Sequence, residues 1–395
     1  MAHPTKPLDG IRVLDFTQSL LGPSATQVLG DYGADVIKVE RAAGDLMRSV
    51  IPDRSGPDNP VFLSLNRNKR SIVLNTKTAE GRGIVHDLAA RADVVVSNFR
   101  PGVMEKMGFG YDTLSELNPR IIWASGTAYG SSGPFRHRAG VDQIAQALTG
   151  LIARRTSDTA PMTIYPTMIC DYTTAMHLAQ GILLALIARG RTGHGQKVEV
   201  SLYDSALALQ SMEATVQLTR GEELNFGRMP LNGVFPTADG EIMVIGVFHD
   251  NALQDISTAL EFDDDLSERP EFRTTELQFA NKDALQGLFR ERLRTKPTAY
   301  WLKRLESVDI MCSRIQTIAE ALRHPQTKVN DVLLDVDHPV EGRFTTVGSP
   351  IHLSASPVEI RYAPPRLGEH GDDILTELGY DQAAIDDLRT RKVLA

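Results

Sequence analysis

Asp171 is the acidic residue whose position best suits nucleophilic chemistry. It precedes a run that is apolar on nearly every side, from Met176 to Ile187. A helix of that composition must be buried, so the Asp171 carboxylate is expected at the entrance of a buried helix. There it either caps the helix by accepting backbone N–H groups or acts as a partly desolvated nucleophile. Position alone favours the cap.

A basic group suited to ligand binding follows the predicted strands. Each member alone is an ordinary surface charge, but eight together in an acidic protein favour an anionic ligand with several phosphates. The group consists of Lys38, Arg41, Arg48, Arg67, Lys69, Arg70, Arg100 and Lys106.

The segment Asn98–Gly102 directly follows a predicted strand. Asn98 offers amide donors and an acceptor, Phe99 offers a flat apolar face, and Gly102 permits close backbone approach. Such a combination suits an adenine ring, although it also suits a rigid turn. Motifs for serine hydrolases and zinc peptidases are missing, so no metal is expected. Cys170 is expected to be a small buried core residue, because no histidine is an evident base for it.

The elements that must position these residues alternate between strands and helices. Strands are predicted at 11–16, 36–40, 71–75, 94–97 and 121–125, with helices at 22–32, 79–92 and 203–218. This alternation indicates an α/β fold with a doubly wound parallel sheet. Ligands bind such sheets beyond the carboxyl ends of the strands, which is where the basic group lies.

The length of 395 residues predicts two domains. Residues 1–220 form the large, Rossmann-like domain. Asp239-Gly240 between apolar runs indicates a hairpin in a smaller, inserted α+β domain at 225–325. Residues 330–395 then return to the large domain.

Composition excludes several classes of protein. The apolar content of 42% and charged content of 23% fit a globular chain, and the net charge of −8 argues against a nucleic-acid partner. No apolar run is long enough for a membrane span, and no signal-peptide pattern opens the chain. The two cysteines indicate a reducing compartment, so we expect a cytoplasmic protein.

Motifs along nearly the whole chain identify a family resemblance. The chain resembles the class III coenzyme A (CoA) transferases, the family of formyl-CoA transferase and carnitine CoA-transferase. The motifs, in order, are PLDGIRVLDF, GADVIKVER, NRNKRSIVLN, VVVSNFRPGVMEKMGFGYD, YGSSGP, DQIAQALTGL, GHGQKVEVSLYDSAL and PPRLGEHGDDIL. The resemblance implies a Rossmann-like large domain, a small domain and a homodimer of two interlocked rings.

The resemblance also implies a chemistry. Asp171 matches the family's catalytic aspartate, which attacks an acyl-CoA to give a mixed anhydride and then an aspartyl-CoA thioester. CoA or acyl-CoA is a substrate, and no permanently bound cofactor or metal is implied. The basic group adds Arg100 to the expected CoA contacts, which are Arg41, Lys69, Arg70, Asn98, Phe99, Arg100, Lys106 and a further arginine, Arg138 or its neighbour Arg136.

Two departures from formyl-CoA transferase bear on the substrate. The segment Leu231–Phe248 lacks its glycine-rich loop, and an apolar residue near Leu20 replaces its glutamine. We therefore expect a small carboxylate other than formate or oxalate, with preference for a dicarboxylate such as succinate. One alternative is an α-methylacyl-CoA racemase, but Val141 stands where such relatives carry a histidine base. A non-catalytic CoA-binding protein is the other alternative.

Overall fold

The chain forms two compact units, of which the second interrupts the first. The computed structural model describes residues 6–50 and 59–395. The first unit comprises Met1–Leu151, Ile164–Gln210 and Asn330–Ala395, and the second comprises Ile152–Thr163 and Ser211–Val329. Residues 152–163 and 211–220 therefore belong to the second unit, and not to the large domain where the sequence placed them.

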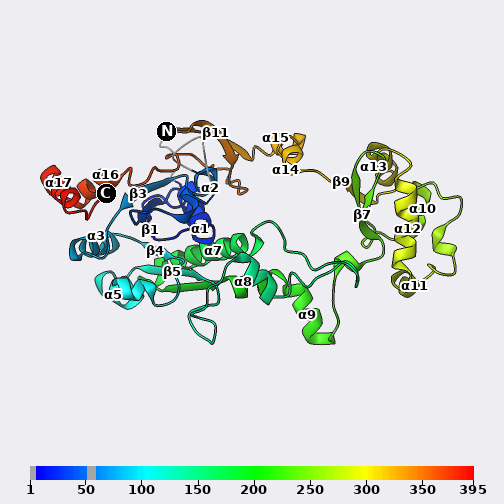
Figure 1. Cartoon of the computed structure of the whole chain (residues 1–395), viewed down its shortest axis with the longest axis horizontal. Helices are drawn as coiled ribbons and strands as arrows, with labels where there is room; N and C mark the ends of the chain where they lie inside the picture. The colour runs from blue at the N-terminus through cyan, green and yellow to red at the C-terminus, as the bar shows by residue number, and fades with distance from the viewer. Residues whose placement is uncertain (1–5, 51–58) are drawn as a thin grey trace. The chain divides into compact units, whose positions relative to one another are not determined.

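The first unit is built on a six-stranded sheet with the order β3-β2-β1-β4-β5-β6 (Figure 1). Every pairing in it is parallel, which confirms the predicted sheet. The central strands β4 and β5 are buried along their whole length because both faces of the sheet are covered there. They are β1 (Arg12–Asp15), β2 (Asp35–Glu40), β3 (Lys69–Val73), β4 (Val94–Ser97), β5 (Ile122–Thr127) and β6 (Lys197–Ser201).

Helices cover both faces of this sheet. One core contains Leu14, Ile72 and Trp123 together with side chains of α3 (Ala79–Ala90), α5 (Tyr111–Leu117) and the C-terminal helices α16 (Gly371–Leu378) and α17 (Gln382–Thr390). On the other face, Val13 and Ile122 pack with α1 (Leu21–Asp31), α7 (Ile169–Thr192) and α8 (Leu202–Leu209). The shorter elements of this unit are η1 (Leu46–Arg48), α2 (Pro60–Leu65), α4 (Val103–Met107), α6 (Asp142–Leu148), and the antiparallel pair β10 (Leu333–His338) and β11 (Gly342–Val347).

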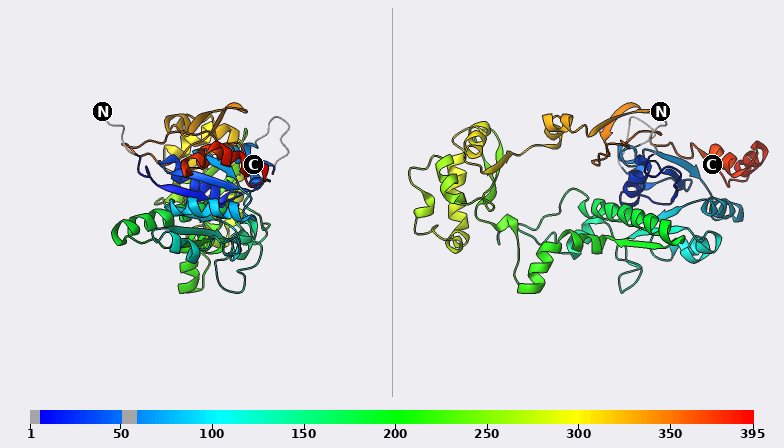
Figure 2. Two further views of the ribbon diagram at one scale, coloured as in Figure 1. Left: turned by 90° about the vertical axis from the view of Figure 1, so that its left-hand side faces the viewer. Right: turned by 180° about the vertical axis from the view of Figure 1, so that it is seen from behind.

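Helix α7 is the long helix that the sequence predicts after Asp171, but it is buried on one face only, since Leu184 and Ile187 are exposed in this chain. It packs against α1, β5, β6 and α8, and it runs alongside the strands in the view from behind (Figure 2). Gly193, with φ +77°, ends it in the left-handed conformation that glycine adopts without strain. Because α7 connects the parallel strands β5 and β6, it begins on the side where β5 ends.

The second unit combines a three-stranded antiparallel sheet with helices. β7 (Asn232–Pro236) and β8 (Glu241–Ile245) form the hairpin that the sequence predicts, and β8 also pairs with β9 (Met311–Arg314). Phe235, Phe289 and Trp301 centre its core. The remaining elements are α9 (Ser211–Arg220), η2 (Phe226–Arg228), α10 (Ala252–Ala259), η3 (Leu266–Glu268), α11 (Thr275–Ala280), α12 (Lys282–Leu293), α13 (Thr298–Glu306), α14 (Ile318–Ala321) and α15 (Pro325–Val329).

The predicted helix at 203–218 is two helices, α8 and α9, that belong to different units. Gln210 separates them: its side-chain amide donates hydrogen bonds to the carbonyls of Thr149 and Ala206. Over residues 6–50 and 59–395, none of the helices is long and apolar enough to cross a bilayer.

Candidate active site

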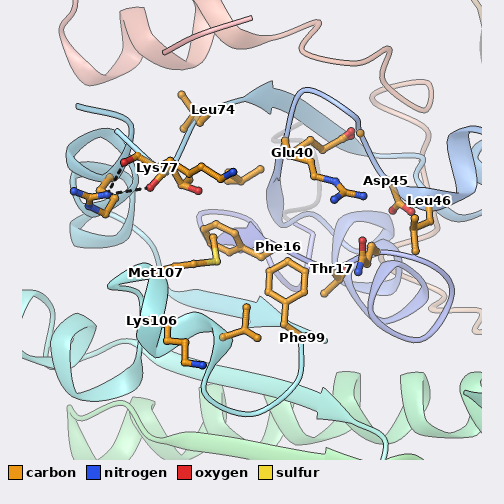
Figure 3. Close-up of a pocket in the computed structure, with 17 residues that line it drawn as sticks. Phe16, Thr17, Glu40, Asp45, Leu46, Leu74, Lys77, Phe99, Lys106 and Met107 are labelled. Atoms are coloured by element: carbon orange, nitrogen blue, oxygen red, sulfur yellow. Dashed lines mark hydrogen bonds between the residues drawn. The ribbon is translucent and has the colours of Figure 1, made fainter. Parts of the chain in front are cut away.

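A pocket of about 620 Å³ lies beyond the carboxyl ends of the sheet strands (Figure 3). Strand order reverses between the neighbours β1 and β4, and such a switch point is where doubly wound sheets bind ligands. Residues at the ends of four strands and in the segments that follow them form the wall. They are Phe16, Thr17, Gln18, Val39, Glu40, Arg41, Gly44, Asp45, Leu46, Leu74, Thr76, Lys77, Arg82, Phe99, Val103, Lys106 and Met107.

Three of the predicted contacts line this pocket. They are Arg41 after β2, Phe99 after β4 and Lys106 on α4. Lys77, in the loop after β3, approaches from another side (Figure 3). Lys77 and Arg82 were not among the predicted contacts, although both follow the strand predicted at 71–75. The pocket therefore combines exposed cations with an aromatic face, as a phosphorylated nucleotide requires.

Three other predicted contacts lie outside the pocket's described wall. Asn98 clamps the loop after β1: its Oδ1 accepts from the Gln18 backbone N–H at 3.0 Å, and its Nδ2 donates to the Gln18 carbonyl at 2.7 Å. Arg100 lines an adjoining cavity of about 290 Å³ that shares Phe99 with the main pocket. The exposed Arg138 stacks on the Phe135 ring, 3.9 Å from its centroid.

The structure corrects the expectation for Lys69 and Arg70, neither of which is among the described residues that line the pocket. Strand β3 begins at Lys69, two residues earlier than predicted, so both side chains belong to a central layer. Lys69 Nζ lies 3.1 Å from Asp15, and both side chains are fully buried. Arg70 pairs with Asp35 at 2.7 Å and Glu377 at 2.6 Å. Both cations therefore stabilise the fold instead of presenting a free charge to a ligand.

A second buried ion pair joins the loops of the pocket wall. Lys38 Nζ lies 2.9 Å from Asp45 and donates to the Thr17 carbonyl at 2.8 Å. Asp45 Oδ1 accepts the backbone N–H groups of Ser19 and Met47, each at 3.0 Å. Ser19 has φ +69°, an unusual conformation for a residue other than glycine, and these bonds hold it there.

The buried network shifts the pKa values of Asp15 and Lys69 in ways that depend on burial and on neighbouring charges. Burial alone would raise the pKa of Asp15, but Lys69, Lys38 and the hydroxyls of Thr17 and Thr26 lower it to about 2. Burial lowers the pKa of Lys69 to about 8, against the opposing effect of Asp15. Asp15 therefore carries its negative charge at neutral pH and anchors the sheet beneath the pocket.

Asp171 is not a helix cap. The cap position belongs to Met168, and Asp171 is the third residue of α7. Within residues 6–50 and 59–395, its carboxylate accepts no hydrogen bond, although the side chain is partly buried. The structure therefore leaves the carboxylate oxygens available for chemistry, which is the property that a nucleophile needs.

The pKa of Asp171 is raised to about 7, first by burial and second by the neighbouring Asp142. Asp142 is 1% exposed, and its carboxylate accepts the Asp171 backbone N–H at 2.9 Å. Four residues along α6, Gln146 binds the backbone of Tyr165 through both its carbonyl oxygen and its amide. Helix α6 thus fixes the start of α7 and places a negative charge beside Asp171.

Cys170 cannot serve as the nucleophile at neutral pH. Its side chain is fully buried, and burial, Asp142 and Asp171 together raise the pKa of its thiol to about 12. The reactive form of cysteine is the thiolate, so this residue is the core packing residue that the sequence predicts.

Asp171 and the pocket both lie toward the carboxyl ends of the strands, but Asp171 is not among the described residues that line the pocket. A Cβ added at Gly126 would lie 2.4 Å from Leu21 of α1 and 3.4 Å from Leu178 of α7. Leu21 follows the pocket loop, and Leu178 lies seven residues after Asp171, or about 10 Å along the helix. A ligand bound in the pocket would reach Asp171 only by extending beyond the residues that line the pocket.

The fold and this site define an α/β protein whose pocket, at a sheet switch point, is lined by cations and an aromatic ring suited to a phosphorylated ligand. Residues 8–371 match the model of CoA-transferase family III, and the chain belongs to that family. Since its relatives are named CoA-transferases, the protein is an enzyme that transfers CoA.

Three curated relatives match across nearly the whole chain. The acyl-CoA transferase of Fusarium pseudograminearum is 36% identical over 394 residues, covering 96% of this chain and 86% of the relative. Human succinyl-CoA:glutarate CoA-transferase is 33% identical, covering 98% and 90%. Formyl-CoA:oxalate CoA-transferase of Streptomyces coelicolor is 34% identical, covering 98% and 99%.

Solved structures agree with the fold. A CaiB/BaiF family protein from Brucella suis has a TM-score of 0.84 at 30% identity, covering 95% of this chain and all of its own (100%). A protein from Mycobacterium tuberculosis has a TM-score of 0.82 at 33% identity, covering 94% and 99%.

Proposed function

We propose that the protein moves CoA from an acyl-CoA donor to a small carboxylic acid through covalent intermediates on Asp171. The observation that carries this proposal is the Asp171 carboxylate, which is partly buried and accepts no hydrogen bond from the described residues. Its pKa of about 7 makes it more basic than an ordinary aspartate while leaving a substantial ionised fraction at neutral pH. A more basic carboxylate is a stronger nucleophile.

The reaction begins when an Asp171 oxygen attacks the thioester carbonyl carbon. The C–S bond breaks, CoA leaves as a thiolate, and a mixed anhydride joins Asp171 to the acyl group. The thiolate then attacks the Asp171 carbonyl carbon, the anhydride C–O bond breaks, and the donor acid leaves as its carboxylate. Asp171 now carries CoA as a thioester, so one difficult exchange is divided into two easier steps.

The acceptor acid reverses these steps. Its carboxylate attacks the aspartyl thioester, which releases CoA thiolate and forms a second anhydride. The thiolate attacks the acceptor's carbonyl carbon, giving the new acyl-CoA and the free Asp171 carboxylate. Charge is conserved throughout, so the mechanism needs no proton donor or acceptor.

The pocket of Figure 3 is proposed as the site for the CoA nucleotide. Arg41, Lys77 and Lys106 supply positive charge for the phosphates, and Phe99 supplies an apolar face for the adenine. The pantetheine arm then accounts for the distance between this pocket and Asp171, because it is the elongated part of the ligand.

Covalent trapping tests the proposal. The protein is incubated with an acyl-CoA and then with hydroxylamine, which converts an aspartyl thioester or anhydride to a hydroxamate. Mass spectrometry is expected to place the modification on Asp171. Asp112→Asn, on α5, serves as a labelling control, since this variant keeps Asp171 and its neighbour Asp142. An unmodified Asp171 during turnover, or full activity in Asp171→Asn, would contradict the mechanism.

The alternatives make different predictions. A racemase needs a proton acceptor near the substrate, but the residue before α6 is Val141, whose side chain cannot take a proton. A non-catalytic CoA-binding protein would not need Asp171. Loss of transfer in Asp171→Ala with unchanged CoA affinity therefore favours the transferase over both.

We also propose an interlocked homodimer in the cytoplasm. Large apolar side chains are exposed on α6, α7 and α8, as expected where a second chain packs; these are Ile144, Leu148, Leu184, Ile187 and Leu207. The chain leaves the first unit and returns to it, so it can form a ring. Cys170 and Cys312 are both free, which fits a reducing compartment.

The acceptor is proposed to be a small acid, with a dicarboxylate such as succinate as the first choice to test. A screen that crosses donor CoA esters with small carboxylates measures this directly. Preference for formate or oxalate would contradict the expectation drawn from Leu20 and from the missing glycine-rich loop.

A further inference from the structure

A second large pocket, of about 720 Å³, lies entirely within the second unit. Its floor is the outward face of the β7–β8 hairpin, where Val234, Met243 and Ile245 point away from the core of that unit. One wall is the part of α12 from Lys282 to Arg290, and η2 with the segment near Thr156 forms the other. The volume lies in the range of small-molecule sites, about 300–1,000 Å³.

Most of this pocket is apolar. Val234 is 51% exposed and Phe248 is 70% exposed, so both present large apolar surfaces to whatever enters. Phe248 pairs with Phe226, with ring centroids 6.0 Å apart. Since exposed side chains of this kind are rarely left without a partner in one contiguous patch, the surface favours an apolar occupant.

Arg290 is the charge that distinguishes this pocket. In the part of the chain that the structure describes, its half-buried guanidinium makes no hydrogen bond or ion pair. Its neighbours are occupied: Lys282 Nζ donates to the carbonyls of Thr156 and Gly227, each at 2.9 Å, and Arg228 pairs with Asp158 at 2.6 Å. Asp283 is the one acidic residue on the described wall, against two cations.

The positive charges of Arg228 and Arg290 lie close enough to Lys282 to affect its pKa. Burial lowers the pKa of Lys282, and Arg228 and Arg290 lower it further against the opposing effect of Asp283. An anion placed beside Arg290 would relieve that repulsion. Guanidinium groups bind carboxylates through paired hydrogen bonds, so the complementary ligand is an anion with an apolar body.

We propose that this pocket binds a small organic carboxylate with an apolar chain, the carboxylate on Arg290 and the chain on Val234, Met243 and Phe248. The site is separate from the nucleotide pocket of the first unit. The inference does not depend on Asp171 or on covalent chemistry, so it can fail or succeed independently of the proposed function.

Methyl NMR of the full-length protein with labelled methionine tests the inference. Hexanoate is titrated while the Met243 methyl signal is followed, its assignment being fixed by Met243→Leu. We expect a saturable shift with hexanoate and at least about tenfold weaker binding of 1-hexanol, which lacks the charge, and of acetate, which lacks the chain. Equal binding of either control would overturn the proposal.

Arg290→Gln is expected to weaken hexanoate about tenfold, the loss of one charge-assisted pair. Arg290→Lys is expected to retain part of the affinity, which separates lost charge from lost folding. Arg294→Gln, an exposed arginine at the end of the same helix, is the matched control and should bind normally. Unchanged affinity in Arg290→Gln would overturn the proposal. A Met243 signal that none of the three probes shifts would also overturn the proposal. Sedimentation equilibrium would then show whether a second copy of the chain covers this face.

Discussion

At the scale of the residue, two side chains matter most: the Asp171 carboxylate, which accepts no hydrogen bond from the described residues, and the Lys69 ammonium, which is fully paired. Asp171 lies in the first turn of a 24-residue helix, whose dipole favours an anion, yet its pKa is raised because burial and Asp142 outweigh the dipole. Lys69 lies in a strand with its charge matched by Asp15. The same kind of sequence evidence, one ionisable residue in a family motif, marked both as functional.

The raised pKa of Asp171 predicts how activity depends on pH. The attacking form is ionised, so kcat is expected to fall as the pH drops through about 7. Asp142→Asn removes the negative neighbour but not the burial, so the acid limb should move to lower pH while staying above that of an exposed aspartate. The pH–rate profile measures this. Asp112→Asn, on α5, should leave the profile in place; a limb unmoved in Asp142→Asn would show that Asp142 does not act on Asp171.

Substitution of Lys69 is predicted to reduce stability, whereas substitution of Lys106 is predicted to weaken the binding of acyl-CoA. Lys69→Met removes the ion-pair partner of the fully buried Asp15, so we expect a loss of about 3–5 kcal/mol in the free energy of unfolding. Lys106 is exposed in the pocket, so Lys106→Met should raise KM for acyl-CoA more than it lowers kcat. Denaturant unfolding and steady-state kinetics on both variants test the pair. Lys328→Met, an exposed lysine of the second unit, should change neither quantity.

At the scale of the element, the pocket depends on loops that are fixed from below. Asp45 ties the loop after β1 to the loop after β2, and Lys38 joins both to the sheet. A strained residue such as Ser19 persists only when its surroundings determine its conformation. The loops are therefore arranged before any ligand arrives, which lowers the ordering cost of binding.

Substitutions of Asp45 test how far its hydrogen bonds to the loops contribute to the binding of acyl-CoA. Asp45→Ala removes the acceptor for Ser19 and Met47, so KM for acyl-CoA is expected to rise about tenfold or more. Asp45→Asn keeps an acceptor oxygen and should restore part of the affinity. Asp265→Ala is the matched control, because Asp265 caps η3 in the second unit in the same way. Comparable KM values in Asp45→Ala and the wild type would show that the loops hold without this link.

The sequence predicts the elements well where a local pattern decides them. The strand 94–97 and the hairpin at Asp239-Gly240 are found as expected, because continuous apolar runs and a tight-turn dipeptide act over a few residues. Strand β3 begins two residues before the strand predicted at 71–75, because Lys69 and Arg70 look like surface residues in the sequence. Their partners Asp15 and Glu377 lie 54 and 307 residues away, and no local pattern reports such distant pairing.

The site was predictable in kind and only partly in detail. Arg41, Phe99 and Lys106 follow strand ends and line the pocket, as the sheet rule requires. Asn98 follows a strand end as well, but it holds the Gln18 backbone, because a side-chain amide serves a loop as readily as a ligand. The free state of the Asp171 carboxylate depends on the position of α6, which the sequence pattern does not specify.

At the scale of the whole molecule, the interrupted first unit makes the proposed interlocking testable. Two linked rings cannot separate while both are folded, so tagged and untagged dimers that are mixed after purification should not exchange subunits. Mixed dimers should appear only after unfolding and refolding together. Affinity capture followed by mass spectrometry measures the exchange. Rapid formation of mixed dimers from folded protein would mean that the chains pack side by side without threading.

The core of the first unit contains residues from nearly opposite ends of the sequence. Leu394, only 2% exposed, forms a bridge with Leu74, and Val393 packs in the same cluster as Leu14 and Ile37. During synthesis, the sheet strands emerge long before the segment that seals their outer layer. While the second unit is being synthesised, the ribosome-bound chain therefore exposes the apolar surface that the C-terminal segment later covers. Chaperones would be expected to bind at that surface.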